Sequence, residues 1–187
     1  DIAVSRGLGD VYKRQAVLDE LEIGAANIIG ASMGGMIAQT VAYDFPERTR
    51  SLISIMSTTW APHLPPPGRE QEQGISDMNE SSAEQAENLE KIGFYPSALP
   101  NQVTAILSAG DRTTQVGTIE APTLVLHGAD DELLSVEHGK HTAEVISGAK
   151  LKIYKNMGHS LPDHVIPEMV NDILGHLSTK PKLASSE

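Results

Sequence analysis

The chain has 187 residues, 40% of them hydrophobic, a composition typical of a globular protein with one sizeable core. Its formal net charge is −11 with no basic cluster, which argues against nucleic acids and anionic membranes as partners. Cysteine is absent, which excludes disulfides, thiolate catalysis and cysteine-ligated zinc, and no apolar run approaches the ~20 residues of a membrane-spanning helix.

Residues 1–15 are expected to be foreign to the protein. The stretch SRGLGDVYKRQ, residues 5–15, corresponds to the in-frame translation of a sequencing-library transposon adapter. It does not match a G-x-G-x-x-G phosphate loop, and no strand precedes it. This segment is therefore not expected to form part of the fold, and the true N-terminus is expected to be missing. Because no targeting signal is visible, we expect a cytoplasmic location.

The first core region, residues 16–60, is predicted to contain two helices and two strands. In chain order these are a helix ending near Gly24, a strand over NIIG (27–30), a helix over MGGMIAQTVAYDF (33–45) that Pro46 stops, and a strand over RSLISIMST (50–58).

The segment 61–117 differs in character, with a proline-rich loop followed by an acidic, polar and partly helical stretch. We expect it to be a lid inserted between core regions. The second core region, residues 118–178, carries the predicted strand PTLVLHG (122–128), helix SVEHGKHTAEVI (135–146), strand AKLKIYKN (149–156) and helix PEMVNDILGHL (167–177), before a polar tail over 179–187.

Strands that alternate with helices predict an α/β fold: a mostly parallel sheet with helices on both faces. In such folds ligands bind at the carboxyl edge of the sheet. The lid would lie over one edge.

Ser32 lies between Gly30 and Gly34, where an apolar strand gives way to a helix. Small residues on both sides allow the backbone to bend sharply and to present the serine hydroxyl above the sheet. The amide of Met33, at the helix N-terminus, can stabilise negative charge and is the predicted oxyanion donor. The pattern predicts an acyl-transfer nucleophile.

A serine hydroxyl needs a base to accept its proton, and His159 is the best candidate of the seven histidines. It lies in NMGHSLP, between the last strand and the last helix, at the same sheet edge as Ser32. His127, at the end of a strand, is expected to be packed structure. His138 and His141 lie three residues apart on a helix; a solvated face is favoured there over a metal site.

The base needs an acid to fix its tautomer and stabilise its charge. HGADDELL supplies Asp130 and Asp131 after the third strand, also at the carboxyl edge. One of the two should face His159. The order Ser…Asp…His is that of α/β hydrolases and differs from those of chymotrypsin and subtilisin.

From about residue 16 to 177 the chain resembles the α/β-hydrolase superfamily, in particular esterase-like members of the aclacinomycin methylesterase type. The matching stretches are NIIGASMGGMIAQTVAYDFPERTRSLISIMST and GDRTTQVGTIEAPTLVLHGADDELLSVEHGKHTAEVISGAKLKIYKNMGHSLP. The resemblance implies Ser32 as nucleophile, His159 as base and the Met33 amide as oxyanion donor. The family's acid usually occupies the last position of H-G-x-x-D, which favours Asp131.

The family's sheet normally has eight strands, whereas this chain carries the equivalents of the last four. The resemblance therefore identifies the chain as a C-terminal part of the fold, without the loop that carries the second oxyanion amide. We expect this loss to impair activity, since one oxyanion donor is worth roughly 3–4 kcal/mol in a comparable enzyme.

The function predicted is hydrolysis of carboxylic esters of small apolar substrates through an acyl-enzyme, with no cofactor and no metal. One alternative is a cofactor-free haloperoxidase or perhydrolase that uses the same three residues. Another is a non-catalytic binding module or pseudoenzyme. The expected partner is a small-molecule ester, not a nucleic acid or a membrane, and neither the exact ester nor the oligomeric state follows from the sequence.

Overall fold

The computed structural model describes residues 15–68 and 99–178. The expected adapter-derived segment, apart from Gln15, lies outside the described residues, as do the tail and residues 69–98 of the expected lid. No helix in the described ranges is long and apolar enough to cross a membrane.

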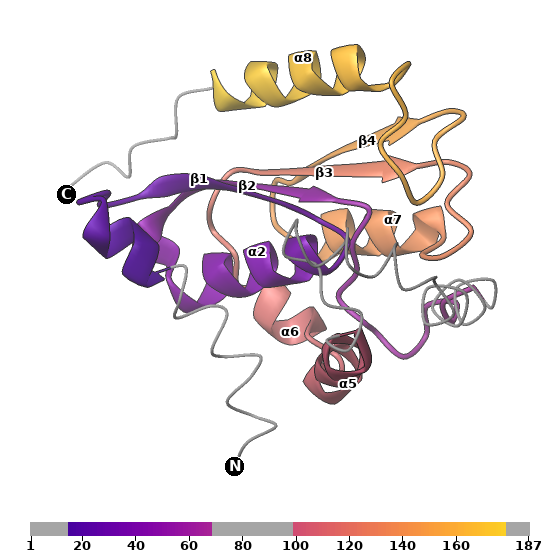
Figure 1. Ribbon diagram of the computed structural model, residues 1–187, viewed down its shortest axis with the longest axis horizontal. Helices are drawn as coiled ribbons and strands as arrows, with labels where there is room; N and C mark the ends of the chain where they lie inside the picture. The colour runs from indigo at the N-terminus through magenta and orange to yellow at the C-terminus, as the bar shows by residue number, and fades with distance from the viewer. Residues whose placement is uncertain (1–14, 69–98, 179–187) are drawn as a thin grey trace, which may run out of the picture.

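Four strands form one fully parallel sheet, in the spatial order β1-β2-β3-β4 (Figure 1). Their bounds are Ala26–Ala31 for β1, Thr49–Ile55 for β2, Thr123–Gly128 for β3 and Lys150–Tyr154 for β4. Each strand therefore lies beside the next one along the chain, and the predicted α/β architecture with a parallel sheet is confirmed.

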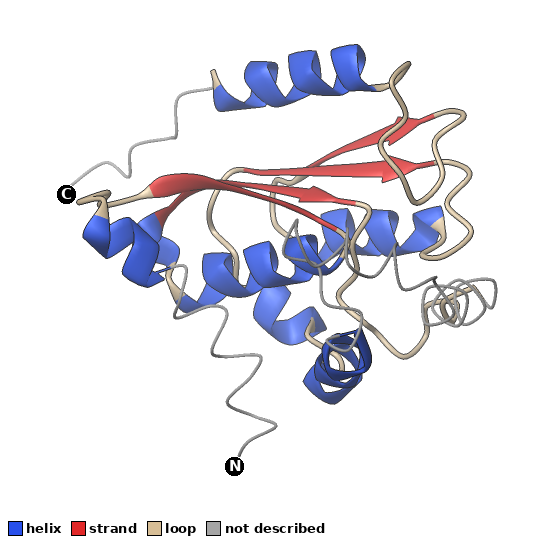
Figure 2. Ribbon diagram, in the orientation of Figure 1, coloured by secondary structure: helices blue, strands red, loops and turns tan. Residues whose placement is uncertain are grey.

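Helices cover both faces of this sheet (Figure 2). Among the helices of residues 15–68 and 99–178, α2, α6 and α7 lie on one face and α8 lies on the other (Figure 1). The helical bounds are Met33–Asp44 for α2, Leu99–Ala109 for α5, Thr113–Val116 for α6, Val136–Val145 for α7 and Ile166–Leu177 for α8, with a 3-10 turn at Pro46–Arg48.

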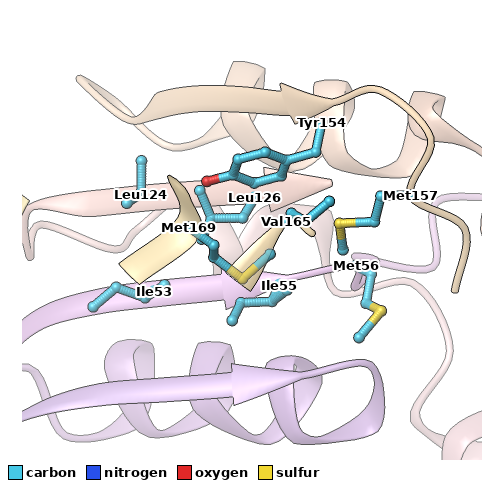
Figure 3. Packing of buried hydrophobic residues seen from close by; sticks show 9 residues of the cluster. All are labelled: Ile53, Ile55, Met56, Leu124, Leu126, Tyr154, Met157, Val165 and Met169. Atoms are coloured by element: carbon cyan, nitrogen blue, oxygen red, sulfur yellow. The ribbon is translucent and has the colours of Figure 1, made fainter. Parts of the chain in front are cut away.

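The two faces of the sheet bury different side chains, because successive residues of a strand point in opposite directions. On the α8 face, Ile53 of β2 is in register with Leu124 of β3, and Ile55 is in register with Leu126. These residues form one buried cluster with side chains from β4 and α8 (Figure 3). Its remaining members are Met56, Tyr154, Met157, Val165 and Met169.

On the opposite face the sheet packs against small side chains. Leu52 of β2 contacts a cluster that includes Ala38 and Ala42 of α2. Alanine at these positions lets the helix backbone approach the sheet closely, so α2 packs directly against β1 and β2. This close packing fixes where α2 begins, and therefore where the preceding bend lies.

The first predicted helix ends earlier than the sequence pattern indicates. Residues 15–20 are helical, whereas the pattern predicts a helix reaching Gly24. Glu22 has a φ of 54°, which interrupts the helix. Arg48 contacts this turn: its guanidinium donates to the Asp19 carboxylate at 2.8 Å and to the Ile23 carbonyl at 3.1 Å.

Candidate active site

Ser32 occupies the bend between β1 and α2 in a strained backbone conformation. Its φ is 53° and its ψ is −121°, a region that residues with a side chain rarely adopt. The Ser32 amide donates to the Ile55 carbonyl of β2 at 2.9 Å. That hydrogen bond ties the bend to the neighbouring strand and helps to hold the strained conformation.

Glycines make the bend possible, although not in the symmetrical way the sequence suggests. A Cβ on Gly30 would collide with the backbone of Gly34, and a Cβ on Gly35 would lie 2.5 Å from Cβ of Ser57. A Cβ on Gly34 would meet no heavy atom within 4 Å. The close approach therefore requires glycine at positions 30 and 35, and it uses the carbonyl rather than the missing side chain of Gly34.

The structure brings Ser32, His159 and Asp131 together at the carboxyl edge of the sheet. His159 Nε2 lies 2.8 Å from Ser32 Oγ, and His159 Nδ1 lies 2.8 Å from Asp131 Oδ2. A carboxylate only accepts hydrogen bonds, so Nδ1 carries the ring proton and donates it to Asp131. Nε2 is then the acceptor for the Ser32 hydroxyl, which is the arrangement that a general base requires.

Two backbone hydrogen bonds hold the Asp131 loop against the His159 loop. The Ala129 amide donates to the Tyr154 carbonyl at 2.8 Å, and the Asp130 amide donates to the Met157 carbonyl at 3.0 Å. Just before these two residues, a Cβ on Gly128 would collide with the Met157 carbonyl, so the two loops approach each other closely. The relative position of the two loops is thus set by main-chain contacts.

The carboxylate of Asp131 is buried and held by several donors. Its Oδ1 accepts the amides of Leu133 at 3.0 Å and Leu134 at 2.9 Å. Burial alone would raise the pKa of Asp131, but hydrogen bonds from His127, His159 and the Leu134 amide outweigh it and hold that pKa well below its usual 3.8. The residue is therefore a carboxylate at neutral pH.

Of the two acidic candidates, Asp131 is the one that contacts His159. Asp130 is exposed, with its amide bonded to the His159 loop. The H-G-x-x-D spacing distinguishes them because Asp131, four residues after His127, has its carboxylate buried 3.3 Å from His127 Nε2. The side chain of Asp130 does not share this buried position.

The other histidines differ in part from expectation. The prediction of a solvated face for His138 and His141 is wrong for His138, which is 3% exposed and bonds to Thr58 Oγ1 at 2.8 Å and the Pro65 carbonyl at 3.0 Å. Those partners lie in the loop after β2, which a helical periodicity cannot reveal. Within residues 15–68 and 99–178, no group of three or more potential metal-ligating side chains occurs.

Sequence reasoning missed the role of Arg112 as a buried link between elements. Its guanidinium donates to the carbonyl of Met36 in α2 at 3.1 Å and to the carbonyl of Thr58 at 2.5 Å. Its amide donates to the Thr59 carbonyl at 2.9 Å. The link joins α2, which begins directly after Ser32, to the segment that leaves β2.

The amide of Met33 lies at the first position of α2, directly after Ser32. The first amides of a helix have no acceptor within the helix, and the helix dipole is positive at this end. The role of the Met33 amide as oxyanion donor stays a prediction.

Comparison with known proteins finds similarity to α/β hydrolases. The family model for the alpha/beta hydrolase fold matches residues 8–89. The chain is 28% identical over 183 residues to a 2-hydroxy-6-oxo-6-phenylhexa-2,4-dienoate hydrolase of Comamonas testosteroni, covering 82% of this chain and 63% of that protein. It is 28% identical over 193 residues to a 2-hydroxy-6-oxononadienedioate/2-hydroxy-6-oxononatrienedioate hydrolase of Cupriavidus pinatubonensis, covering 87% of this chain and 66% of that protein.

Among solved structures, the chain resembles a 2-hydroxy-6-oxo-6-phenylhexa-2,4-dienoate hydrolase from a Rhodococcus species, with a TM-score of 0.77 and 16% identity over 95% of this chain and 72% of that one. The chain has the α/β-hydrolase fold, and its sequence is similar to those of α/β hydrolases. It spans just under two thirds of the length of the curated relatives that it matches.

Proposed function

We propose that the chain is a serine hydrolase that cleaves carboxylic esters of small apolar substrates. The observation that carries this proposal is the pair of 2.8 Å contacts that link Ser32 to His159 and His159 to Asp131. Ser32 is the nucleophile, His159 the general base, and Asp131 the carboxylate that orients the ring. The chain covers only part of its relatives' length. The proposal therefore concerns the chemistry of these three residues, and the same activity is proposed for any longer protein that contains them.

The reaction proceeds in two halves. Ser32 Oγ attacks the ester carbonyl carbon while His159 Nε2 takes the hydroxyl proton. The alcohol leaves with that proton, and an acyl group stays on Ser32. Water then gives a proton to His159 and attacks the acyl carbonyl, which releases the acid and restores the hydroxyl. The Met33 amide stabilises the oxyanion in both halves.

A second candidate reaction is suggested by the names of the relatives. A 2-hydroxy-6-oxo-6-phenylhexa-2,4-dienoate contains no ester, so its hydrolysis must break a carbon–carbon bond beside the 6-oxo group. Ser32 can attack that ketone as it attacks an ester carbonyl, but the bond that breaks is C5–C6. C5 must therefore first gain a proton by tautomerisation of the 2-hydroxy-dienoate to the 2-oxo form, so that the leaving group departs as a conjugated enolate. The ester remains the first proposal because His159 can protonate a departing alkoxide directly.

Fluorophosphonate labelling tests the proposal independently of the substrate. We expect the chain to form a covalent adduct at Ser32, detected by mass spectrometry, and we expect Ser32→Ala to form none. Ser178→Ala, which removes an exposed hydroxyl bonded to the Leu174 carbonyl, is the control and should label as the native chain does. A chain that fails to label, or labels equally well after Ser32→Ala, contradicts the proposal.

Turnover then separates the two reactions. Hydrolysis of p-nitrophenyl esters that is lost in Ser32→Ala supports the ester assignment. The carbon–carbon alternative is supported if the chain consumes a 2-hydroxy-6-oxo-dienoate but no ester. The loss of the dienoate's visible absorbance measures this consumption.

A further inference from the structure

His127 is wholly buried next to the Asp131 carboxylate. It lies at the end of β3, with both its own side chain and that of Asp131 fully inaccessible to solvent. The ring fits against α7 only because residue 139 is glycine: a Cβ there would lie 2.6 Å from His127 Nδ1. The ring is therefore confined between the acid loop and one helix.

The surroundings of the ring define its protonation. His127 Nε2 lies 2.7 Å from the carbonyl oxygen of Leu134 and 3.3 Å from Asp131 Oδ2. Both partners are acceptors, so Nε2 carries a proton. Nδ1 is buried and has no hydrogen-bond partner among the described residues. A second proton there would be desolvated and unpaired, which favours a neutral ring.

A neutral donor has a particular effect on a carboxylate. It restrains Oδ2 without cancelling the negative charge, which stays available to the imidazolium that forms on His159 during reaction. The same N–H holds the Leu134 carbonyl, while the Leu134 amide donates to Asp131 Oδ1 at 2.9 Å. His127 thus restrains the carboxylate directly and through its loop.

We propose that His127 is a positioning residue: it holds the Asp131 carboxylate in place, and the carboxylate in turn orients the His159 ring. This inference rests on the proposed serine hydrolase function. It goes beyond the packing role expected from the sequence, because it assigns to His127 an influence on the proton affinity of His159.

Three substitutions separate positioning from packing. His127→Phe keeps a ring and removes the donor. His127→Gln carries an amide nitrogen to the distance of Nε2 and keeps the donor, whereas His127→Asn reaches only the distance of Nδ1. His176→Phe is the matched control, because His176 is also buried and its Nε2 donates to the Pro122 carbonyl, before the opposite end of β3.

The readouts are the pH profile of kcat/KM for a p-nitrophenyl ester, whose acid limb reports the base of the free enzyme, and the NMR titration of the His159 ring. Without the His127 donor the Asp131 carboxylate holds the His159 proton more strongly. We expect His127→Phe and His127→Asn to move both titrations to higher pH and to lower kcat/KM roughly 10- to 100-fold, the value of a hydrogen bond to a charged group.

We expect His127→Gln to keep the native titration and most of the rate, and His176→Phe to keep the native titration. If His127→Phe does not fold, the difference between His127→Gln and His127→Asn decides. Unchanged titrations in His127→Phe and His127→Asn, or a shift in His127→Gln equal to theirs, overturn the proposal.

The two proposals fail separately. A native chain whose Ser32 does not react with a fluorophosphonate contradicts the hydrolase function. The NMR titration needs no turnover, so in that case it still decides whether His127 controls the state of His159.

Discussion

The bend at Ser32 depends on the presence or absence of single side-chain atoms at the neighbouring glycines. Ser32 itself carries the unfavourable φ, while the space for the bend comes from the missing Cβ of Gly30 and of Gly35. Two glycines of the motif that look equivalent in the sequence, Gly30 and Gly34, therefore have different requirements.

Gly30→Ala should disrupt the bend, whereas Gly34→Ala should not. The new methyl group at position 30 must push the Gly34 carbonyl away, and such overpacking costs about 1–3 kcal/mol. At position 34 the methyl group enters open space, and alanine is the better helix former by up to ~1 kcal/mol. Urea unfolding and fluorophosphonate labelling measure both; equal losses in the two variants would contradict this account.

The low pKa of Asp131 makes part of the stability depend on pH. The ionised Asp131 carboxylate stabilises the folded state fully at pH values above its ordinary pKa of 3.8. This contribution is lost as the pH falls below 3.8, toward the depressed pKa of the folded state. Asp131→Asn should therefore unfold more easily at pH 7, by about 1–3 kcal/mol, and the difference from the native chain should shrink below pH 3.8. Denaturant titrations over this range check it, and a difference independent of pH would count against it.

The sequence could predict Ser32, Asp131 and His159 as a group because each follows a strand at one edge of a parallel sheet. The preference for Asp131 over Asp130 came from a family spacing, and its physical basis is the burial of Asp131 beside His127. The contact between His127 and Asp131 was not predicted, although their separation of four residues across a turn was a usable signal.

Arg112 acts on the arrangement of elements. It joins α2 to the segment after β2 through two main-chain carbonyls, and its own amide adds a third link. Burial lowers the pKa of this guanidinium, but not enough to discharge an arginine side chain. The link therefore stays charged and intact across ordinary pH.

Arg112→Met should destabilise the fold by roughly 2–5 kcal/mol, because it leaves two carbonyl groups without their charged donor. Arg50→Met is the control, since Arg50 is exposed on β2 and should change the free energy of unfolding by less than about 0.5 kcal/mol. Both values come from denaturant unfolding. An Arg112 variant as stable as the control would show that the link contributes nothing.

The strands and helices of the described residues were largely predictable, because their hydrophobic periods agree with their burial. The predicted strand at 27–30 and helix at 33–45 correspond to β1 and α2 within one residue at each end. The end of the first helix was not predictable, since the positive φ of Glu22 has no sequence signal of the kind that glycine gives. Long-range partners such as those of His138 and Arg112 also depend on loops whose path the periodicity does not define.

The molecule as a whole exposes apolar surface on its α8 side. Val170 and Leu174 lie one helical turn apart on α8 and are 46% and 56% exposed, and Ile29 on β1 is 50% exposed. Within the described part of the chain, β1 pairs with β2 alone. Exposed apolar patches and open strand edges both favour association.

Replacing Val170 and Leu174 together by Gln should reduce self-association and the binding of a hydrophobic dye, with little change in the free energy of unfolding. Met169→Gln, on the buried face of the same helix, should instead destabilise the chain. Light scattering after size-exclusion chromatography, dye fluorescence and urea unfolding provide the measurements. A native chain that does not associate, or a double variant that associates as strongly as the native chain, would contradict this prediction.

The direct pairing of β2 with β3 has a consequence for how this protein could diversify. The chain leaves the sheet after Ile55 and re-enters it at Thr123, beside the strand it left. That connection also contacts the surroundings of the site: Ser57 lies against Gly35, Thr58 and Pro65 bond to His138, and the Gly68 amide donates to the Leu133 carbonyl beside Asp131. Insertions, deletions or exchanges that keep these contacts and those of Arg112 leave the pairing of β2 with β3 untouched. The same arrangement of Ser32, His159 and Asp131 can thus be combined with different segments between β2 and β3. Exchanging this connection between relatives is a direct route to altered selectivity.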